Sequence, residues 1–276
     1  MPKATHTEII KTIIENLSLL NKIATNGELS PNARRRLGKD IAELQQQLND
    51  LLVSVDLIRQ PDSVFDPSEP KVVGRFVALA MVAQTRQALA SLDKFYGAGV
   101  YAIYYTGDLP TYERIKNTET PIYVGKADPE VGNARTPMEQ GTRLTNRLND
   151  HKKNINKANN LDIHDFEYRS LVVQSGWQTA AESYLIHLFK PIWNKETKII
   201  YGLGKHGDSA STRSNKRSPW DTLHPAREWA ADASLVDAKT PEDIDKELDA
   251  HFQATKVYQH LEDVLEEFIS ELSQIS

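Results

Sequence analysis

The chain has 276 residues, no cysteine, and 38 Asp and Glu against 33 Lys and Arg, which gives a formal net charge of −5. The absence of cysteine excludes disulfide scaffolds, Cys-ligated zinc, iron–sulfur clusters and thiol nucleophiles. A hydrophobic fraction of 39% with 26% charged residues is ordinary for a globular protein of one large or two modest domains. The mildly acidic balance, taken alone, argues against a surface coated in positive charge for nucleic acid.

The N-terminus does not resemble an export signal, because Met1-Pro2-Lys3 leads into an amphipathic stretch rather than a solid apolar segment with a cleavage site. The longest apolar run covers residues 76–83, whereas a membrane-spanning helix needs about 20 residues. We therefore expect a cytoplasmic protein without a membrane segment.

Residues 1–72 are expected to form a helical hairpin and a linker. Apolar residues recur at helical spacing on both sides of a turn at Asn26-Gly27: Ile9, Ile10, Ile13, Ile14, Leu17 and Leu20, then Leu37, Ile41, Leu44, Leu48, Leu51, Leu52 and Val55. Ser30-Pro31 supplies an N-cap and a proline at the first position of the second helix. Both stripes need partners, so we interpret the hairpin as a scaffold or dimerisation arm. Residues 59–71, with three prolines, are predicted to be extended.

The rest of the chain predicts an α+β fold, with a small mixed three-stranded sheet and its leading helix at 73–200. The helix is expected over 74–96, ended by Gly97. Strands are expected at 99–105, 122–124 and 166–173, and further helices at 139–158 and 177–189. Residues 201–240 contain a loop rich in Gly, Ser, Lys and Arg at 202–219, and 241–276 predict one acidic C-terminal helix that begins at Pro241.

Two predicted strands each carry a tyrosine beside a glycine. They are Gly99-Val100-Tyr101 and Tyr123-Val124-Gly125. Glycine lets a neighbouring group approach the backbone closely, and a phenol can donate or accept a hydrogen bond or take part in proton transfer. In isolation, a strand tyrosine is more often a packed aromatic residue than a catalyst.

Three further features can contribute chemistry. Arg147 and His151 are four positions apart on a predicted helix, so they share a face from which Arg can stabilise a phosphate and His can move a proton. Glu182 has no i+4 partner, because residue 186 is Ile, and it can bind a hard divalent cation. Asn194 can orient a group through its amide. Each has a structural alternative: a solvated helix face, a surface carboxylate or a loop residue.

In this order and spacing, the motifs resemble the GIY-YIG nuclease superfamily over about residues 97–196. The two tyrosines are 22 positions apart (123 − 101), which implies an insertion between the first two strands, as expected of the type II restriction enzymes of the superfamily. The segments 202–206 and 218–229 look like those of the branch that cuts CCGCGG. Ala226 departs from this branch, which usually has glycine there.

The resemblance implies hydrolysis of a phosphodiester with one Mg²⁺ held by Glu182. Tyr101, alone or with His151, would deprotonate or position the attacking water, and Arg147 would stabilise the pentacovalent phosphate. Tyr123 and Asn194 would complete the hydrogen-bond frame. Which tyrosine or histidine is the general base stays open at this point.

The charge pattern locates basic segments that could hold DNA. Residues 126–160 carry +3 and residues 190–229 carry +4, whereas residues 241–276 carry −8, so the first 240 residues sum to +3. Candidate DNA-binding residues are Lys126, Arg143, Lys205, Arg213, Lys216, Arg217 and Arg227. The loop residues among them could read bases or contact phosphates only, and Lys126 could instead close its strand as an exposed lysine.

The expected partners are double-stranded DNA, a second copy of the chain, and a cognate DNA methyltransferase that protects the host. A homodimer is expected because cutting both strands of a palindrome calls for two symmetry-related sites. Two alternatives stay open: a GIY-YIG repair or mobile-element nuclease, and a non-catalytic DNA-binding protein with the same fold.

Overall fold

The computed structural model describes residues 5–26, 29–55, 58, 64–203, 216–225, 228–231 and 234–273. The chain divides into two compact units, Met1–Ser63 and Val64–Ser276, and each is described by itself. Among the described residues, no helix combines the length and the apolar character that crossing a membrane requires.

The first unit contains the two expected helices, α1 (His6–Thr25) and α2 (Pro31–Val55). A capping box starts α1, because the Thr5 hydroxyl accepts from the Glu8 N–H and the Glu8 carboxylate accepts from the Thr5 N–H. The Ser30 hydroxyl accepts from the Ala33 N–H at the start of α2. Both predicted helices are thus confirmed. No residue of either helix is buried, and their apolar stripes are therefore not covered within the described residues.

In the second unit, α3 (Pro70–Val82) begins and ends earlier than the expected 74–96. Proline at the first helical position explains the start. The end has a topological cause: Val82 packs on one face of the sheet, whereas Leu89 is buried on the other face. The chain must therefore round the edge of the sheet, which it does as the short strand β1 (Gln87–Ala88) and the 3-10 helix η1 (Leu89–Ser91).

The sheet has four strands rather than three, and all its pairings are antiparallel rather than mixed. Its order is β1-β4-β2-β3, with β2 at Gly99–Tyr105, β3 at Tyr123–Ala127 and β4 at Phe166–Val172. The extra strand is the two-residue β1, which pairs with β4 where a longer helix was expected. The α+β class itself is confirmed.

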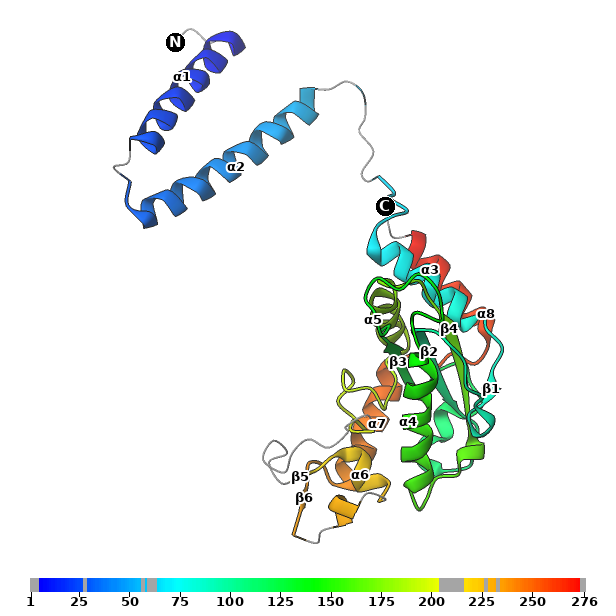
Figure 1. The fold of residues 1–276 in the computed structure, drawn as a ribbon. Coiled ribbons are helices and arrows are strands. Elements are labelled where there is room, and N and C mark those ends of the chain that lie inside the picture. The colour runs from blue at the N-terminus through cyan, green and yellow to red at the C-terminus, as the bar shows by residue number, and fades with distance from the viewer. Residues whose placement is uncertain are drawn as a thin grey trace. The chain divides into compact units, whose positions relative to one another are not determined.

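Strand β2 is buried along its whole length because helices cover both faces of the sheet. Its residues alternate between two cores: Tyr101, Ile103 and Tyr105 face one, and Val100, Ala102 and Tyr104 face the other. The first core is covered by α4 (Arg143–Lys157), and the second by α5 (Gln178–Phe189), which packs against α3 (Figure 1).

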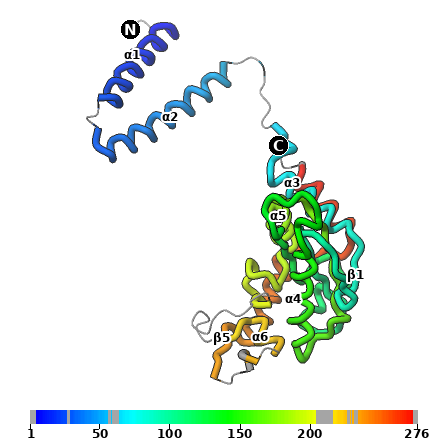
Figure 2. The backbone as a smooth tube through the Cα atoms, in the orientation of Figure 1, coloured from blue at the N-terminus to red at the C-terminus, as the bar shows by residue number. Residues whose placement is uncertain are grey.

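The expected single C-terminal helix is instead two helices, α7 (Pro241–Ala254) and α8 (Leu261–Ser273). The cause is again the two-sided core, since α7 buries Ile244 in the first core and α8 buries Val264 in the second. Between the helices, the Glu119 N–H donates to the Tyr258 carbonyl at 2.7 Å. Helix α8 then runs beside α3 (Figure 2). There Phe268 meets Phe76, with ring centroids 5.7 Å apart.

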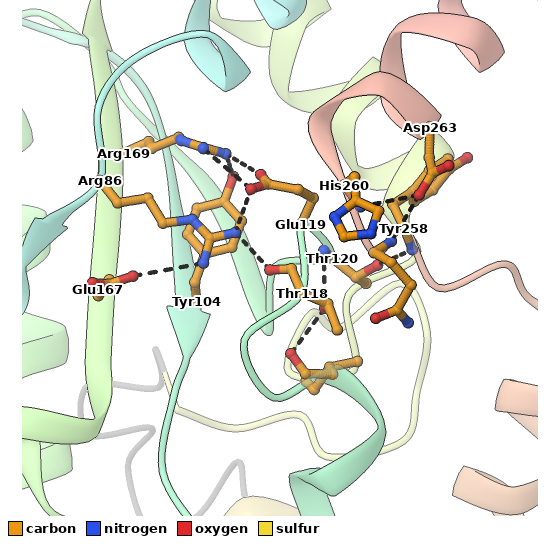
Figure 3. Close-up of polar contacts among 12 residues, drawn as sticks. Arg86, Tyr104, Thr118, Glu119, Thr120, Glu167, Arg169, Tyr258, His260 and Asp263 are labelled. Carbon is orange, nitrogen blue, oxygen red and sulfur yellow. Dashed lines mark hydrogen bonds and ion pairs between the residues drawn. The ribbon is translucent and has the colours of Figure 1, made fainter.

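A partly buried ion-pair network anchors the end of the insertion between β2 and β3. Arg86 and Arg169 converge on the carboxylate of Glu119, and the Arg86 guanidinium stacks 4.0 Å from the ring centroid of Tyr104 (Figure 3). Burial opposes ionisation of Glu119, but the two guanidinium groups outweigh it and hold the pKa of this carboxyl below its ordinary value. The insertion, which also contains the 3-10 helix η2 (Pro110–Ile115), is thus tied to β4.

Several short elements complete the unit. The 3-10 helix η3 (Ile163–Asp165) precedes β4. In the segment expected to be a loop, the described residues form β5 (Lys216–Arg217), α6 (Pro219–Leu223), the 3-10 helix η4 (Glu228–Ala231) and β6 (Val236–Asp237). Strands β5 and β6 pair in parallel. The Ser218 hydroxyl caps α6, a helix that was not expected here, by accepting from the Asp221 N–H.

Candidate active site

A cavity of about 1020 Å³ lies where β3, α4, α5, the loop after α5 and α7 meet. Four of the six residues expected to be catalytic line it: Tyr123, Arg147, Glu182 and Asn194. The other two, Tyr101 and His151, are buried behind this wall. Residues that span almost 100 positions of the sequence are therefore brought to one place.

The register of β2 and β3 explains the glycine of the second motif. Tyr101 pairs with Gly125, and Ile103 pairs with Tyr123, so both tyrosine rings lie on one face beside Gly125. A Cβ at residue 125 would lie 2.6 Å from the Tyr101 hydroxyl and 2.9 Å from a carbon of the Tyr123 ring. The close approach predicted from the sequence is thus present, and it leaves no room for a side chain at this position.

Gly125→Ala is therefore expected to reduce the catalytic activity of this site about 100-fold or more, because a displaced reacting group is this costly. Circular dichroism should show that the fold is kept. Gly132→Ala is the matched control, since a Cβ there meets nothing within 4 Å. Equal activity of the two variants would contradict the packing that we assign to the tyrosine pair.

Tyr123, Tyr101 and His151 form a chain of polar groups that leads away from the cavity. The Tyr101 hydroxyl lies 2.7 Å from His151 Nε2, and the ring centroids of Tyr101 and Tyr123 are 6.1 Å apart. The ring centroids of Tyr123 and His151 are 4.6 Å apart. Burial raises the pKa of both phenols, most strongly that of Tyr101. Both tyrosines are therefore neutral at neutral pH.

Arg147 places its positive charge between these phenols and the cavity. Burial by itself would lower the pKa of Arg147, but the adjacent hydroxyl groups of Tyr101 and Tyr123 raise it above its ordinary value. The guanidinium consequently stays charged under all relevant conditions. Because Arg147 lines the cavity, it can donate to an anionic group bound there.

Glu182 presents a half-buried carboxyl group to the same cavity. Burial raises its pKa from 4.5 to about 7, and the nearby charge of Glu196 acts in the same direction. The positive charge of Lys126 acts against these effects. A carboxylate that is costly to ionise and faces a cavity is well suited to a divalent cation, which would favour its charged form.

Asn194 uses its amide to hold strand β3. Its Oδ1 accepts from the Val124 N–H at 2.9 Å, and its Nδ2 donates to the Val124 carbonyl at 2.8 Å. Since β3 is an edge strand, this side chain takes the place of a neighbouring strand. Asn194 therefore positions Tyr123, and its amide is already engaged in the folded protein.

Two of the candidate DNA-binding residues surround Asp128 beside the cavity. The Lys126 ammonium lies 2.7 Å from an Asp128 carboxylate oxygen, and Arg143 Nε donates to the Asp128 carbonyl at 3.0 Å. The hydrogen bond from Lys126 lowers the pKa of Asp128. Gln178 also donates to the Asp128 carboxylate, at 3.1 Å. This cluster organises the end of β3 next to Glu182.

The candidates in the C-terminal segment have different surroundings. Lys216 is exposed, whereas the Arg217 guanidinium contacts the Asp237 carboxylate at 2.8 Å and the Leu235 carbonyl at 3.1 Å. Arg217 thus joins β5 to β6. The remaining candidates, and the Ala226 that departs from the branch pattern, lie outside the described residues: Lys205, Arg213, Ala226 and Arg227.

The cavity also contains charged residues that were not singled out from the sequence. Glu196 and Lys198 come from the loop after Asn194, and Glu247 comes from α7. Glu196 could have been found from the sequence, because it lies two positions after Asn194. Glu247 offered none, because its predicted helix gave no indication of which part of the core it would cover.

Comparison with known proteins places this site in a family. Residues 93–252 match the family model described as the Eco29kI GIY-YIG domain, which covers more than half of the chain and every residue of the site. No curated protein matches the chain significantly. The order of the motifs, their convergence on one cavity and the family match agree, and the chain therefore belongs to the Eco29kI family of GIY-YIG domains, which are nucleases of the restriction endonuclease type.

Proposed function

We propose that this protein is a type II restriction endonuclease that hydrolyses phosphodiester bonds in double-stranded DNA with one Mg²⁺ per active site. The observation that carries the proposal is the convergence of Tyr123, Arg147 and Glu182 on one cavity, with Tyr101 and His151 directly behind it. A neutral phenol chain, a permanent cation and a carboxylate of raised pKa are the groups that metal-assisted phosphodiester hydrolysis uses.

The residues present fit a single hard cation. Among the described residues, no group of three or more His, Asp or Glu side chains is close enough to chelate a metal. Glu182 would therefore be the protein ligand, with water and phosphate oxygens as the others. A bound Mg²⁺ would supply charge stabilisation for the phosphate and a more acidic water.

The chain's own residues would bind the phosphate and move the proton. Arg147 donates to the non-bridging phosphate oxygens as negative charge builds up on them. Tyr123, the phenol that lines the cavity, would contact and orient the attacking water, and Tyr101 would pass its proton to His151 Nε2 as it takes up the proton that the water loses. We thus assign the water contact to Tyr123 and the end of the proton path to His151.

The target that we propose is the palindrome CCGCGG. Its support is the likeness of residues 202–206 and 218–229 to the branch that cuts this sequence. Lys216, which is exposed beside this segment, is a candidate for contact with the DNA. Lys205 and Arg213, two of the other loop candidates, lie outside the described residues.

Plasmid cleavage tests the proposal. The purified chain is incubated with a plasmid that carries one CCGCGG site, with Mg²⁺ or with EDTA. A single linear product that requires Mg²⁺ is expected, and prior methylation of the site should protect the plasmid, as a paired methyltransferase would. Linear product from another site would reject only the target, whereas random nicking would favour a repair or mobile-element nuclease. Tight binding without cleavage would favour a non-catalytic protein.

A homodimer is part of this proposal, and the first unit supports it. In α2 the apolar positions 37, 41, 44, 48, 51 and 55 alternate between spacings of four and three, which is the pattern of a coiled-coil seam. In α1 positions 10, 13, 17, 20 and 24 follow the same rule. Ile41 and Leu51, both on the α2 seam, are 43% and 51% exposed. A second copy would cover this seam and supply the second active site.

Substitutions on and off the seam test the dimer by light scattering. The wild-type chain is expected to have twice its 31.1 kDa monomer mass, and the double variant Ile41→Asp with Leu51→Asp to have the monomer mass. Val53→Asp is the control, because Val53 is 58% exposed but lies off the seam. A monomeric wild type, or equal masses for all three proteins, would refute the assignment of the seam to dimerisation.

A further inference from the structure

Four buried or loop side chains form a continuous hydrogen-bonded path beside the catalytic cavity. Trp193 Nε1 lies 2.9 Å from the Tyr112 hydroxyl, the Tyr112 hydroxyl meets His224 Nε2, and His224 Nδ1 lies 3.0 Å from Asn160 Oδ1. Tyr112 and His224 are fully buried. The catalytic roles proposed above use none of the four.

The partners fix the direction of every hydrogen bond in the path. The Asn160 Nδ2 donates to the Leu223 carbonyl at 2.9 Å, so its Oδ1 faces His224 and accepts from Nδ1–H. Burial lowers the pKa of His224 to about 3, so the imidazole is neutral and its Nε2 accepts from the Tyr112 O–H. The Tyr112 oxygen in turn accepts from the indole N–H of Trp193. All donors and acceptors on the path are matched.

The path joins parts of the chain that the sequence separates widely. Tyr112 belongs to η2 in the insertion, Asn160 follows α4, and Trp193 is next to Asn194 in the wall of the cavity. His224 directly follows α6. Trp220 of α6, also fully buried, packs against both Trp193 and His224, with ring centroids 6.2 and 5.2 Å away. The C-terminal segment is thus attached directly to the wall of the active site.

We propose that His224 is a positioning residue that holds residues 216–225 in register with the catalytic cavity, so that Lys216 meets the DNA while the scissile phosphate lies at Arg147. This inference rests on the proposed function, because it concerns how the same DNA is bound. An apolar side chain of similar size could fill the space of His224, but it could not fix an orientation through two directional hydrogen bonds. The role belongs to His224 because one of its ring nitrogens bonds the insertion at Tyr112 and the other bonds the α4–β4 connection at Asn160.

A double-mutant cycle on DNA affinity tests the proposal. Dissociation constants for CCGCGG duplex in Ca²⁺ are measured for wild type, His224→Phe, Lys216→Ala and the double variant. Lys216→Ala alone should weaken binding about 5- to 10-fold, as loss of one phosphate contact does. In the His224→Phe background, the same change should weaken it less than about 2-fold, because Lys216 is already displaced. Additive effects of the two substitutions would overturn the proposal.

Single-turnover cleavage by the same proteins separates positioning from chemistry. His224→Phe should raise KM about 10-fold or more, with kcat for bound DNA within about 3-fold of wild type. A fall in kcat with unchanged KM would overturn the proposal. Wild-type protein that binds but does not cleave would instead refute the proposed function and leave the binding cycle valid. His164→Phe and Lys246→Ala, both at exposed positions, are the controls. If His224→Phe does not fold, Tyr112→Phe breaks the same path with the loss of one oxygen.

Discussion

Replacing Glu182 by glutamine is expected to reduce cleavage at least about 1,000-fold, because the variant loses the carboxylate that faces the cavity and would hold Mg²⁺. Glutamine has nearly the same shape, so the side chain can still lie between α5 and β3. The measurement is single-turnover cleavage of the plasmid at saturating enzyme. Glu266→Gln, at an exposed position of α8, is the matched control and should cleave like wild type.

The same substitution should stabilise the fold at alkaline pH. The carboxyl of Glu182 has a pKa of about 7 in the folded protein and 4.5 as its ordinary value. Between these values the folded state binds the proton more tightly than the unfolded state, so the free energy of unfolding falls as pH rises through this window. Glu182→Gln has no carboxyl group to ionise, so its free energy of unfolding should not fall in this way as pH rises. It should be about 1–2 kcal/mol more stable than wild type near pH 8, after allowance for solvent screening, and no more stable near pH 4.

Urea unfolding of both proteins at the two pH values checks this expectation. A variant that is inactive and also less stable near neutral pH would show that Glu182 holds the fold together instead of serving the site.

In wild type, the same pKa predicts that cleavage at limiting Mg²⁺ falls as pH drops through about 7, because the protonated carboxyl does not bind the cation. Higher Mg²⁺ concentrations should shift this fall to lower pH.

Arg147→Ala is expected to lower the cleavage rate about 100- to 1,000-fold while DNA binding falls less than about 10-fold. The guanidinium lines the cavity beside Tyr123, so its strongest interaction is expected with the charge that develops in the transition state. Binding to the rest of the duplex depends on other cations and is largely kept. Filter binding in Ca²⁺ and single-turnover cleavage in Mg²⁺ measure the two quantities separately.

Two controls decide whether the effect of Arg147→Ala is local. Lys153→Ala removes a cation from an exposed position of the same helix and should change cleavage less than about 2-fold. Arg147→Lys keeps the charge but loses the planar fork, so partial activity is expected. Equal losses of binding and cleavage in Arg147→Ala would mean that the residue serves ground-state binding, and its proposed role would be wrong.

The sequence predicted which residues meet at the cavity more closely than it predicted where the helices and strands begin and end. Glycine beside tyrosine on two strands, Arg and His four positions apart on a helix, and an unpaired Glu are local patterns, so they could be recognised without knowing the fold. The starts of α2 and α7 were also predicted, because an N-cap and a proline at the first helical position act within one turn.

Helix ends set by the sheet could not be read in this way. The stretch from Val82 to Leu89 is compatible with a continuing helix by composition, and so is the tail after Pro241. Both break because consecutive apolar residues belong to cores on opposite faces of the sheet. Which face a residue covers depends on long-range pairing, and no local propensity reports it.

The sequence by itself determined the family, the residue types of the site and the order of its motifs, because these depend on short-range spacing. Only the tertiary structure decided which phenol lines the cavity, that the Asn194 amide holds β3, and that Arg217 pairs with Asp237. It also joined His224 to Tyr112 across 112 positions. These contacts form between segments whose distance is set by the packing of both faces of the sheet, which only the folded chain establishes.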